Sequence, residues 1–154
     1  MDQNILIKFE DVSAVYENGV GIFNISFDIS KGEFVFIMGP TGSGKSTVLR
    51  SIYMDVQIKE GNLFFNHDDL SKLKKRNIPF IRREIGMIFQ DYKLLEDRCV
   101  FDNVSLPLEI SGIKSTHIKE RVYDMLKKVG LEDKADIIPT KLSGGERQRI
   151  AIAR

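Results

Sequence analysis

Apolar and polar residues alternate along the first thirty positions of the chain in two runs, ILIKFEDVSAVYE (residues 5–17) and VGIFNISFDI (residues 20–29). The dipeptide Asn18–Gly19 separates the two runs. Asn-Gly between alternating runs is typical of a tight β-hairpin, because both residue types tolerate the positive φ that the turn requires. The pattern therefore predicts an antiparallel β unit at the start of the chain, closed by a turn at Lys31–Gly32.

Two continuous apolar runs come later, EFVFIM (residues 33–38) and IGMIFQ (residues 85–90). Unbroken apolar runs of this length are typical of strands that are buried on both faces, as in a parallel sheet. The run GNLFFN (residues 61–66) predicts a further strand between them. Together these runs indicate a sheet with a buried central part.

Helices are expected between and after these strands. One should run from near Lys45 to before Asp55, and a short one should cover residues 68–77 and end before Pro79. From Phe101 onward the pattern is helical. In residues 115–130 five apolar residues share one helical face, and Gly130 stands where a C-terminal cap belongs; the five are Ile118, Val122, Met125, Leu126 and Val129.

This order of elements indicates an α/β nucleotide-binding core that carries a helical subdomain. The chain of 154 residues has a formal net charge of +1, which argues against broad affinity for nucleic acid. No apolar stretch approaches the ~20 residues needed to cross a bilayer, and residues 1–10 lack a signal-peptide pattern. Cys99 is the single cysteine, so no internal disulfide can form, and we expect it to be a small buried apolar residue.

The strongest chemical motif is GPTGSGKST (residues 39–47), which fits the pattern G-x-x-x-x-G-K-[ST] of a phosphate-binding loop. An apolar run precedes it and a helix is expected after it, as the mechanism requires. Gly42 and Gly44 let backbone N–H groups surround phosphate oxygens, and the helix N-terminus adds about half a positive charge. Lys45 is expected to reach the β- and γ-phosphates of ATP, and Ser46 to coordinate Mg²⁺.

A second constellation is LSGGERQR (residues 142–149). A serine and two glycines at a helix start offer a hydroxyl, N–H groups and a positive dipole end, which together make a second anion site. The alternative is an ordinary serine-capped helix start. One nucleotide does not need two such sites in one subunit.

Leu142, Ser143, Gly144 and Gly145 resemble the signature motif of ABC-type ATPases, and Lys45 lies upstream at the distance typical of that family. The resemblance implies a P-loop NTPase with a RecA-like core, an antiparallel β subdomain and a helical ABC subdomain. It also implies a head-to-tail homodimer with two ATP molecules at its interface. The ATP-binding residues that it implies are Tyr16, Gly39, Pro40, Thr41, Gly42, Ser43, Gly44, Lys45, Ser46, Thr47, Gln90, Ser143, Gly144 and Gly145.

Two of these residues are placed by the resemblance alone. Gln90 matches the Q-loop glutamine, which touches Mg²⁺ and the attacking water, and with Lys45 it would form the catalytic set in the chain. The alternative is a polar residue at a strand end. Tyr16 matches the aromatic residue that stacks on adenine, and its alternative is core packing in the hairpin.

The segment RREIGMIFQDYKLLEDRCVFDNVSLPLEI (residues 82–110) resembles the cell-division branch of the family most closely. Lipoprotein-releasing and macrolide-exporting relatives are the alternatives, but they tend to carry a proline where Glu96 stands. Cys99 replaces a usual threonine, and Glu146 a common glutamine. The branch implies an integral membrane permease-like partner and a peripheral location on the cytoplasmic face of the bacterial inner membrane, with no nucleic-acid partner.

The resemblance suggests a β subdomain over residues 1–32, a core with both nucleotide loops over 33–92 and a helical subdomain over 93–154. The family's next strand, with its Mg²⁺-binding Asp and its general-base Glu, is expected beyond Arg154, so the C-terminal part of the core would be missing. We therefore expect this piece to be inactive in hydrolysis and poorly stable. A non-hydrolysing ATP-dependent clamp is the alternative function.

Three further features have a functional and a purely structural interpretation. The basic residues near position 76 are expected to form a solvated face, with weak attraction to anionic lipid as the alternative; they are Lys72, Lys74, Lys75, Arg76, Arg82 and Arg83. His67 and His117 lie far apart, so metal binding is not expected of them. Four apolar residues after Gln90 could line a groove for a membrane subunit, but core packing is an equally good interpretation of each; they are Leu94, Leu95, Val100 and Phe101.

Overall fold

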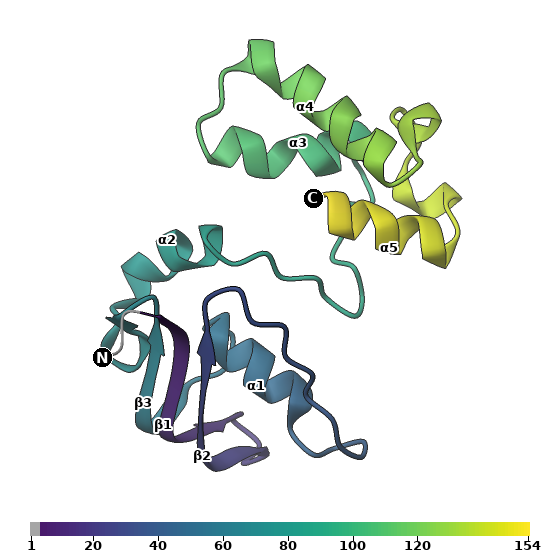
Figure 1. Cartoon of the computed structure of the whole chain (residues 1–154). Coiled ribbons are helices and arrows are strands. Elements are labelled where there is room, and N and C mark those ends of the chain that lie inside the picture. Colours follow the sequence, from purple (N-terminus) through teal and green to yellow (C-terminus); the bar gives the residue numbers. More distant parts are fainter. Residues whose placement is uncertain (1–3) are drawn as a thin grey trace. The chain divides into compact units, whose positions relative to one another are not determined.

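The structure is a computed structural model that describes residues 4–154. The chain divides into two compact units, Met1–Gly86 and Met87–Arg154. Each unit has its own hydrophobic core. The first contains a sheet with helix α1, and the second contains helices α3, α4 and α5 (Figure 1).

The sheet of the first unit is antiparallel throughout and has the strand order β2-β1-β3-β4. Its strands are β1 (Ile5–Val15), β2 (Gly21–Ser30), β3 (Ile58–Phe65) and β4 (Asp68–Asp69). The predicted hairpin is confirmed. At its turn the N–H of Val20 donates to Oδ1 of Asn18, and Gly19 has a φ of 81°.

The helix predicted to start near Lys45 is confirmed as α1 (Lys45–Ile52), and its apolar side packs onto this sheet. Val48 and Ile52 are buried in the same cluster as Phe9, Val12 and Leu63 of the sheet. The ring of Phe9 stacks on that of Phe27, with 4.5 Å between centroids. This packing holds α1 on the sheet.

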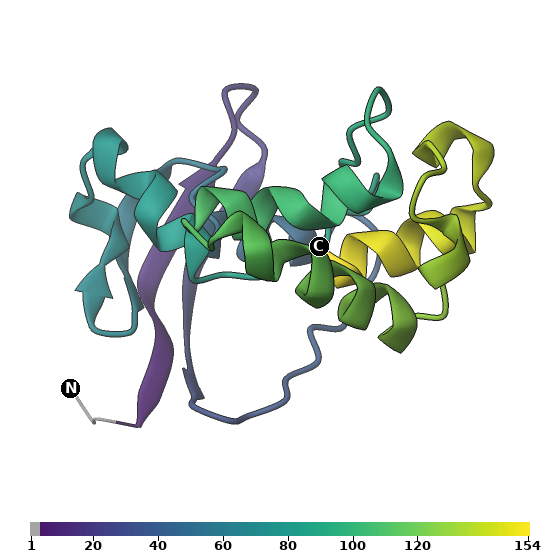
Figure 2. The same ribbon diagram turned by 90° about the horizontal axis from the view of Figure 1, so that it is seen from above.

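The two predicted central strands are wrong as strands in the part of the chain that the structure describes. Residues 33–38 form an irregular loop between β2 and α1, visible in Figure 2, in which Phe34 is 81% and Met38 86% exposed. Residues 85–90 are also irregular, and Ile88 is exposed. A strand needs a neighbour for its N–H and C=O groups, and neither segment pairs with the single sheet of residues 4–154. No parallel sheet therefore forms there.

The helix predicted over residues 68–77 is also wrong. The segment forms strand β4 and two short 3₁₀ turns, η1 (Leu70–Lys72) and η2 (Lys75–Asn77). Pro79 lies in the first turn of helix α2 (Ile78–Arg83) instead of ending a helix. Proline is favoured there because the N–H that it lacks would have no partner within the helix.

The second unit is helical. It contains α3 (Val100–Ile110), α4 (Ser115–Lys128) and α5 (Gly144–Ala153), with the short turns η3 (Glu132–Lys134) and η4 (Pro139–Lys141) between the last two helices. Its core is built by apolar residues from all three helices and the loop after α4. Its buried residues include Val100, Val104, Val122, Leu126, Leu131 and Ile150.

The predicted face of α4 is largely confirmed. Ile118, Val122 and Leu126 are buried, and Val129 packs against the same cluster. Met125 is 43% exposed, contrary to prediction, because the buried stripe centres on Val122 and Met125 lies at its edge. Gly130 has a φ of 66° directly after the helix, as a C-terminal cap requires.

The expectation that Cys99 is a buried residue is wrong. Cys99 is half-buried at the N-cap of α3, and the buried residues of this helix begin one position later, at Val100. Among residues 4–154 no helix is both long and apolar enough to cross a membrane. No cluster of three or more His, Cys, Asp or Glu residues suited to a metal ion occurs in that range either.

Candidate nucleotide-binding site

The phosphate loop (residues 39–47) is shaped by its glycines. Gly42 and Gly44 have φ values of 84° and 90°, in the left-handed region that favours glycine. The N–H of Ser43 donates to the carbonyl of Pro40 at 3.3 Å, which closes a turn between these positions. Pro40, Thr41 and Ser43 are exposed, so the loop faces solvent.

Gly44 is the N-cap of α1, and its position leaves no room for a side chain. A Cβ atom there would lie 2.6 Å from Cγ2 of Ile22 on β2. In the described part of the chain, no side chain caps this helix and no acidic residue stands in its first turn. The first N–H groups of α1 therefore point out of a positive helix end without a side-chain acceptor, which is the arrangement that receives an anion.

Lys45 lies across the same loop. Its Nζ donates to the carbonyl oxygens of Gly39, at 2.9 Å, and Pro40, at 2.7 Å. The ammonium is thereby held next to the glycine turn and the helix start, where it adds a full positive charge. Both acceptors are neutral carbonyls, so an anion that enters the loop offers the ammonium a stronger partner.

The two hydroxyl residues after Lys45 have different surroundings. Ser46 is exposed on the first turn of α1, where its oxygen is free to face a cation. Thr47 is buried, and its carbonyl accepts the hydroxyl of Ser51 at 2.6 Å. A hydroxyl at the position of Ser46 suits Mg²⁺, which takes one or two protein oxygens together with phosphate oxygens and water.

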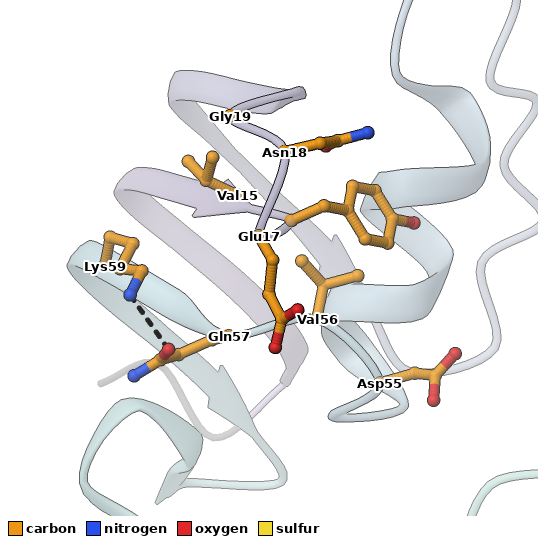
Figure 3. A pocket seen from close by; sticks show the side chains of 9 residues that line it. Val15, Glu17, Asn18, Gly19, Asp55, Val56, Gln57 and Lys59 are labelled. Carbon is orange, nitrogen blue, oxygen red and sulfur yellow. Dashed lines mark hydrogen bonds between the residues drawn. The ribbon is translucent and has the colours of Figure 1, made fainter.

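Tyr16 follows strand β1 and links a pocket to α1. The pocket has a volume of about 690 Å³ and is lined by residues 15–19, 55–57 and Lys59 (Figure 3). Its rim carries the carboxylates of Glu17 and Asp55, and Nζ of Lys59 donates to Oε1 of Gln57 at 2.9 Å. The hydroxyl of Tyr16 accepts a hydrogen bond from Nη1 of Arg50 on α1, at 3.4 Å. The ring thus lies beside the helix that carries the phosphate loop.

In the second unit, Gln90 is exposed and begins the loop of residues 90–99. The loop reverses direction at Tyr92 and Lys93, whose φ values are 59° and 48°. The guanidinium of Arg154 donates to the carbonyl oxygens of both, at 3.2 Å for Tyr92 and 2.6 Å for Lys93. The start of the Gln90 loop is thus tied to the end of α5.

The other end of this loop is held by Asn103 of α3, which has no exposed surface. Its Oδ1 accepts the N–H of Leu95 at 2.7 Å. Its Nδ2 donates to the carbonyl oxygens of Leu95, Arg98 and Cys99, at 3.0, 3.3 and 3.0 Å. One buried amide therefore fixes the backbone of residues 95–99.

The signature segment (residues 142–149) begins with Leu142 buried in the helical core, which positions Ser143 as the N-cap of α5. Ser143 and Glu146 form a capping box. The N–H of Glu146 donates to Oγ of Ser143 at 3.3 Å, and the N–H of Ser143 donates to Oε2 of Glu146 at 2.8 Å. Oγ of Ser143 also donates to Oε2 of Glu146, at 2.6 Å.

These bonds keep Glu146 ionised. The hydroxyl and the N–H of Ser143 both donate to its carboxylate and hold its pKa below the usual range, with a smaller contribution from Lys134 and Arg149. The signature segment thus differs from the phosphate loop, since its own residues already occupy its serine. The interpretation of a serine-capped helix and that of an anion site both fit this geometry.

The structure brings the predicted site residues together in two groups. Tyr16 and residues 39–47 lie around α1 in the first unit, whereas Gln90 and residues 143–145 lie near α5 in the second. Three residues were missed from the sequence. Arg50 and Arg154 gave no signal, since a basic residue on a helix is usually solvated, but Asn103 stands among apolar residues of a predicted helix, where a buried amide needs partners.

Comparisons with known proteins place this geometry in a family. The family model described as ABC transporter matches residues 22–154. The cell division ATP-binding protein FtsE of Bacillus subtilis (strain 168) is 46% identical over 150 residues, which cover 97% of this chain and 66% of that protein. The FtsE protein of Escherichia coli (strain K12) is 47% identical over 150 residues, which cover 97% of this chain and 68% of that protein.

Solved structures agree with these relatives. The bacterial ABC transporter cassette MJ0796, solved as a dimer, has a TM-score of 0.88 and 35% identity, over 96% of this chain and 68% of that one. The cbiO1 subunit of an ABC transporter complex from Clostridium perfringens has a TM-score of 0.81 and 28% identity, over 97% of this chain and 60% of that one.

The chain spans about two thirds of the length of the curated relatives that it matches. The predicted fold class, a P-loop NTPase of the ABC type with an antiparallel β subdomain, is confirmed by the solved cassettes. The resemblance to the cell-division branch is confirmed by the FtsE relatives. On the family model and these likenesses, the chain belongs to the ABC transporter family.

Proposed function

We propose that this chain forms the ATP-binding part of an ABC-type ATPase that serves a bacterial cell-division complex. The observation that carries the proposal is the open, glycine-capped start of α1 with Lys45 lying across it. Relatives named cell division ATP-binding protein, at 44–47% identity, support the choice of complex.

Each phosphate-loop residue has a distinct task in this proposal. Lys45 exchanges its two carbonyl partners for the β- and γ-phosphate oxygens, which are stronger acceptors. Backbone N–H groups of the phosphate loop surround the phosphates, and Ser46 supplies an oxygen to Mg²⁺. Bound Mg²⁺ would neutralise phosphate charge and orient the γ-phosphate.

The adenine end of the nucleotide is assigned to Tyr16. Its ring is partly exposed beside α1, and its hydroxyl is anchored by Arg50, so the ring plane is held for stacking. Gln90 is assigned to the bound Mg²⁺ and the attacking water. Hydrolysis is proposed for the complete protein, and we assign no general base among residues 4–154.

Two copies are proposed to pair head to tail, so that residues 143–145 of one copy approach the γ-phosphate held by the other. A related cassette was solved as a dimer, and in a post-hydrolysis state bound to ADP and Pi. An integral membrane permease-like subunit of the FtsX type would receive the closing motion. This partner would keep the ATPase at the cytoplasmic face of the inner membrane.

The decisive experiment replaces Lys45 with Ala and measures equilibrium binding of MgATP. Losing charge-assisted hydrogen bonds to two phosphates is expected to weaken binding by about 10- to 100-fold. Lys31→Ala, which removes an exposed lysine after β2, is the matched control and should bind as the unsubstituted protein does. Equal binding by the Lys45→Ala variant and the control would refute the proposed role of the loop.

A further inference from the structure

The hydroxyl of Ser143 already has a partner within its own helix turn. It donates to Oε2 of Glu146 at 2.6 Å, and the N–H of Ser143 donates to the same oxygen at 2.8 Å. The serine hydroxyl has one proton to give. It therefore cannot donate to a phosphate oxygen and to Glu146 at the same time.

The partner is also an anion. Glu146 lies in the first turn of α5, where its negative charge offsets the positive end of the helix. Lys134 and Arg149 act on the same carboxylate, but neither forms a hydrogen bond with it in the described residues. A γ-phosphate that approaches Ser143 thus meets a negative group at hydrogen-bond distance from the serine.

Charge and geometry can be separated at this position. A glutamine in place of Glu146 still completes a capping box, because its Oε1 accepts the N–H of Ser143. It removes the negative charge and makes a neutral, weaker acceptor for the serine hydroxyl. The carboxylate is therefore not needed for the helix start to form.

We propose that Glu146 competes with the γ-phosphate for the hydroxyl of Ser143 and thereby sets the ATP concentration at which two copies close. This inference rests on the proposed function, since it concerns the same dimer. At each of the two sites, Glu146 comes from one copy and the γ-phosphate is held by the phosphate loop of the other copy. Glu146 therefore affects closure and leaves the affinity of a single subunit for ATP unchanged.

The test uses the full-length protein with Mg²⁺ and the non-hydrolysable analogue AMP-PNP, and follows dimerisation by sedimentation velocity. Glu146→Gln is compared with the unsubstituted protein and with Glu120→Gln, which removes an exposed carboxylate from α4. Glu146→Gln should lower the analogue concentration for half-maximal dimer by about three- to tenfold, since two like-charge contacts are relieved per dimer. Glu120→Gln should leave that concentration unchanged.

Two further measurements separate this role from a structural one. AMP-PNP affinity at a protein concentration where only monomer is present should be equal for all three proteins. Raising the salt concentration should narrow the difference in dimerisation between Glu146→Gln and the unsubstituted protein, because ions screen the repulsion. A difference that did not change with salt would contradict an electrostatic competitor.

The outcomes distinguish failure of the role proposed for Glu146 from failure of the proposed ATP-binding function. Normal analogue-driven dimers with no shift in Glu146→Gln would overturn the role of Glu146 and leave the ATP-binding proposal standing. An equal shift in Glu120→Gln would also overturn it, because total charge would then be the cause. Failure of the unsubstituted protein to bind AMP-PNP would refute the proposed function itself.

Discussion

Helices α1 and α5 both begin at glycine-containing segments, yet their first turns are completed in different ways. At α1 a left-handed glycine is the cap, and a lysine is the first helical residue. At α5 a serine is the cap, and Glu146 in the first turn closes a box with it. No side chain caps the first helix end, whereas at the second the box already engages the hydroxyl of Ser143. That hydroxyl can donate to a ligand only by exchanging its partner.

The largest expected effect comes from adding a methyl group at the first cap. Gly44→Ala forces a left-handed conformation on a residue with a Cβ and places that atom against Ile22. We expect a loss of about 3 kcal/mol in the free energy of unfolding, and loss of ATP binding. Urea unfolding followed by circular dichroism, with a nucleotide-binding assay, checks both.

Gly145→Ala is the matched change at the second helix start. A Cβ there would meet nothing closer than 4.0 Å, and the residue lies inside the helix. Stability should stay the same or rise by up to about 1 kcal/mol, because alanine favours helix. Equal destabilisation by the two alanines would contradict the contrast between the two helix starts.

The next largest effect is expected from removing the serine hydroxyl at each helix start, at Ser143 and at Ser46. Ser143→Ala removes the cap of α5 and should cost about 1 kcal/mol of unfolding free energy. Ser46→Ala removes an exposed hydroxyl from α1 and should change stability by no more than about 0.5 kcal/mol, while it weakens the binding of MgATP. Thermal unfolding and nucleotide binding, measured on both variants, would show this crossed pattern; its reversal would refute the assignment.

A smaller effect concerns pH. The hydrogen bonds of Ser143 hold the pKa of Glu146 below that of the unfolded chain. The ionised carboxylate therefore stabilises the fold above the usual glutamate pKa, and this contribution is lost as the pH falls through the lowered pKa. The stability difference between the unsubstituted protein and Glu146→Gln should shrink between pH ~6 and ~3. Thermal melts across this range test it, and a constant difference would argue against the capping role.

The smallest expected effect uses inorganic phosphate as a probe of the open helix end. At a concentration near its dissociation constant, phosphate should raise the melting temperature by about 1–2 °C, because it binds only the folded protein. Lys45→Ala should abolish the rise, whereas Ser143→Ala should keep it. A rise that persisted in Lys45→Ala would show that phosphate binds elsewhere.

Local sequence signals predicted most of the elements that local interactions hold. The Asn18–Gly19 turn, the helix after Gly44 and the cap at Gly130 depend on residues within a few positions, and all three are confirmed. Residues 33–38 and 85–90 have the composition of buried strands but depend on distant neighbours for their hydrogen bonds. Apolar composition alone could not supply those neighbours.

The candidate site divides in the same way. The phosphate loop could be identified because its spacing encodes a backbone shape. The bond between Ser143 and Glu146 could have been predicted too, since a serine followed three residues later by a glutamate is the signal of a capping box. The contacts of Arg50 and Arg154 could not, because each joins residues that are more than thirty positions apart.

The amide of Asn103 has a consequence for how the loop of residues 90–99 can vary. Its partners are backbone atoms of Leu95, Arg98 and Cys99, so the side chains at Glu96 and Asp97 are unconstrained by these bonds. The number of residues between the partners is constrained, since an insertion would move at least one carbonyl out of reach of a buried donor. The side chains at Glu96 and Asp97 can therefore vary without loss of these bonds, whereas the number of residues from Leu95 to Cys99 is fixed by the buried amide of α3.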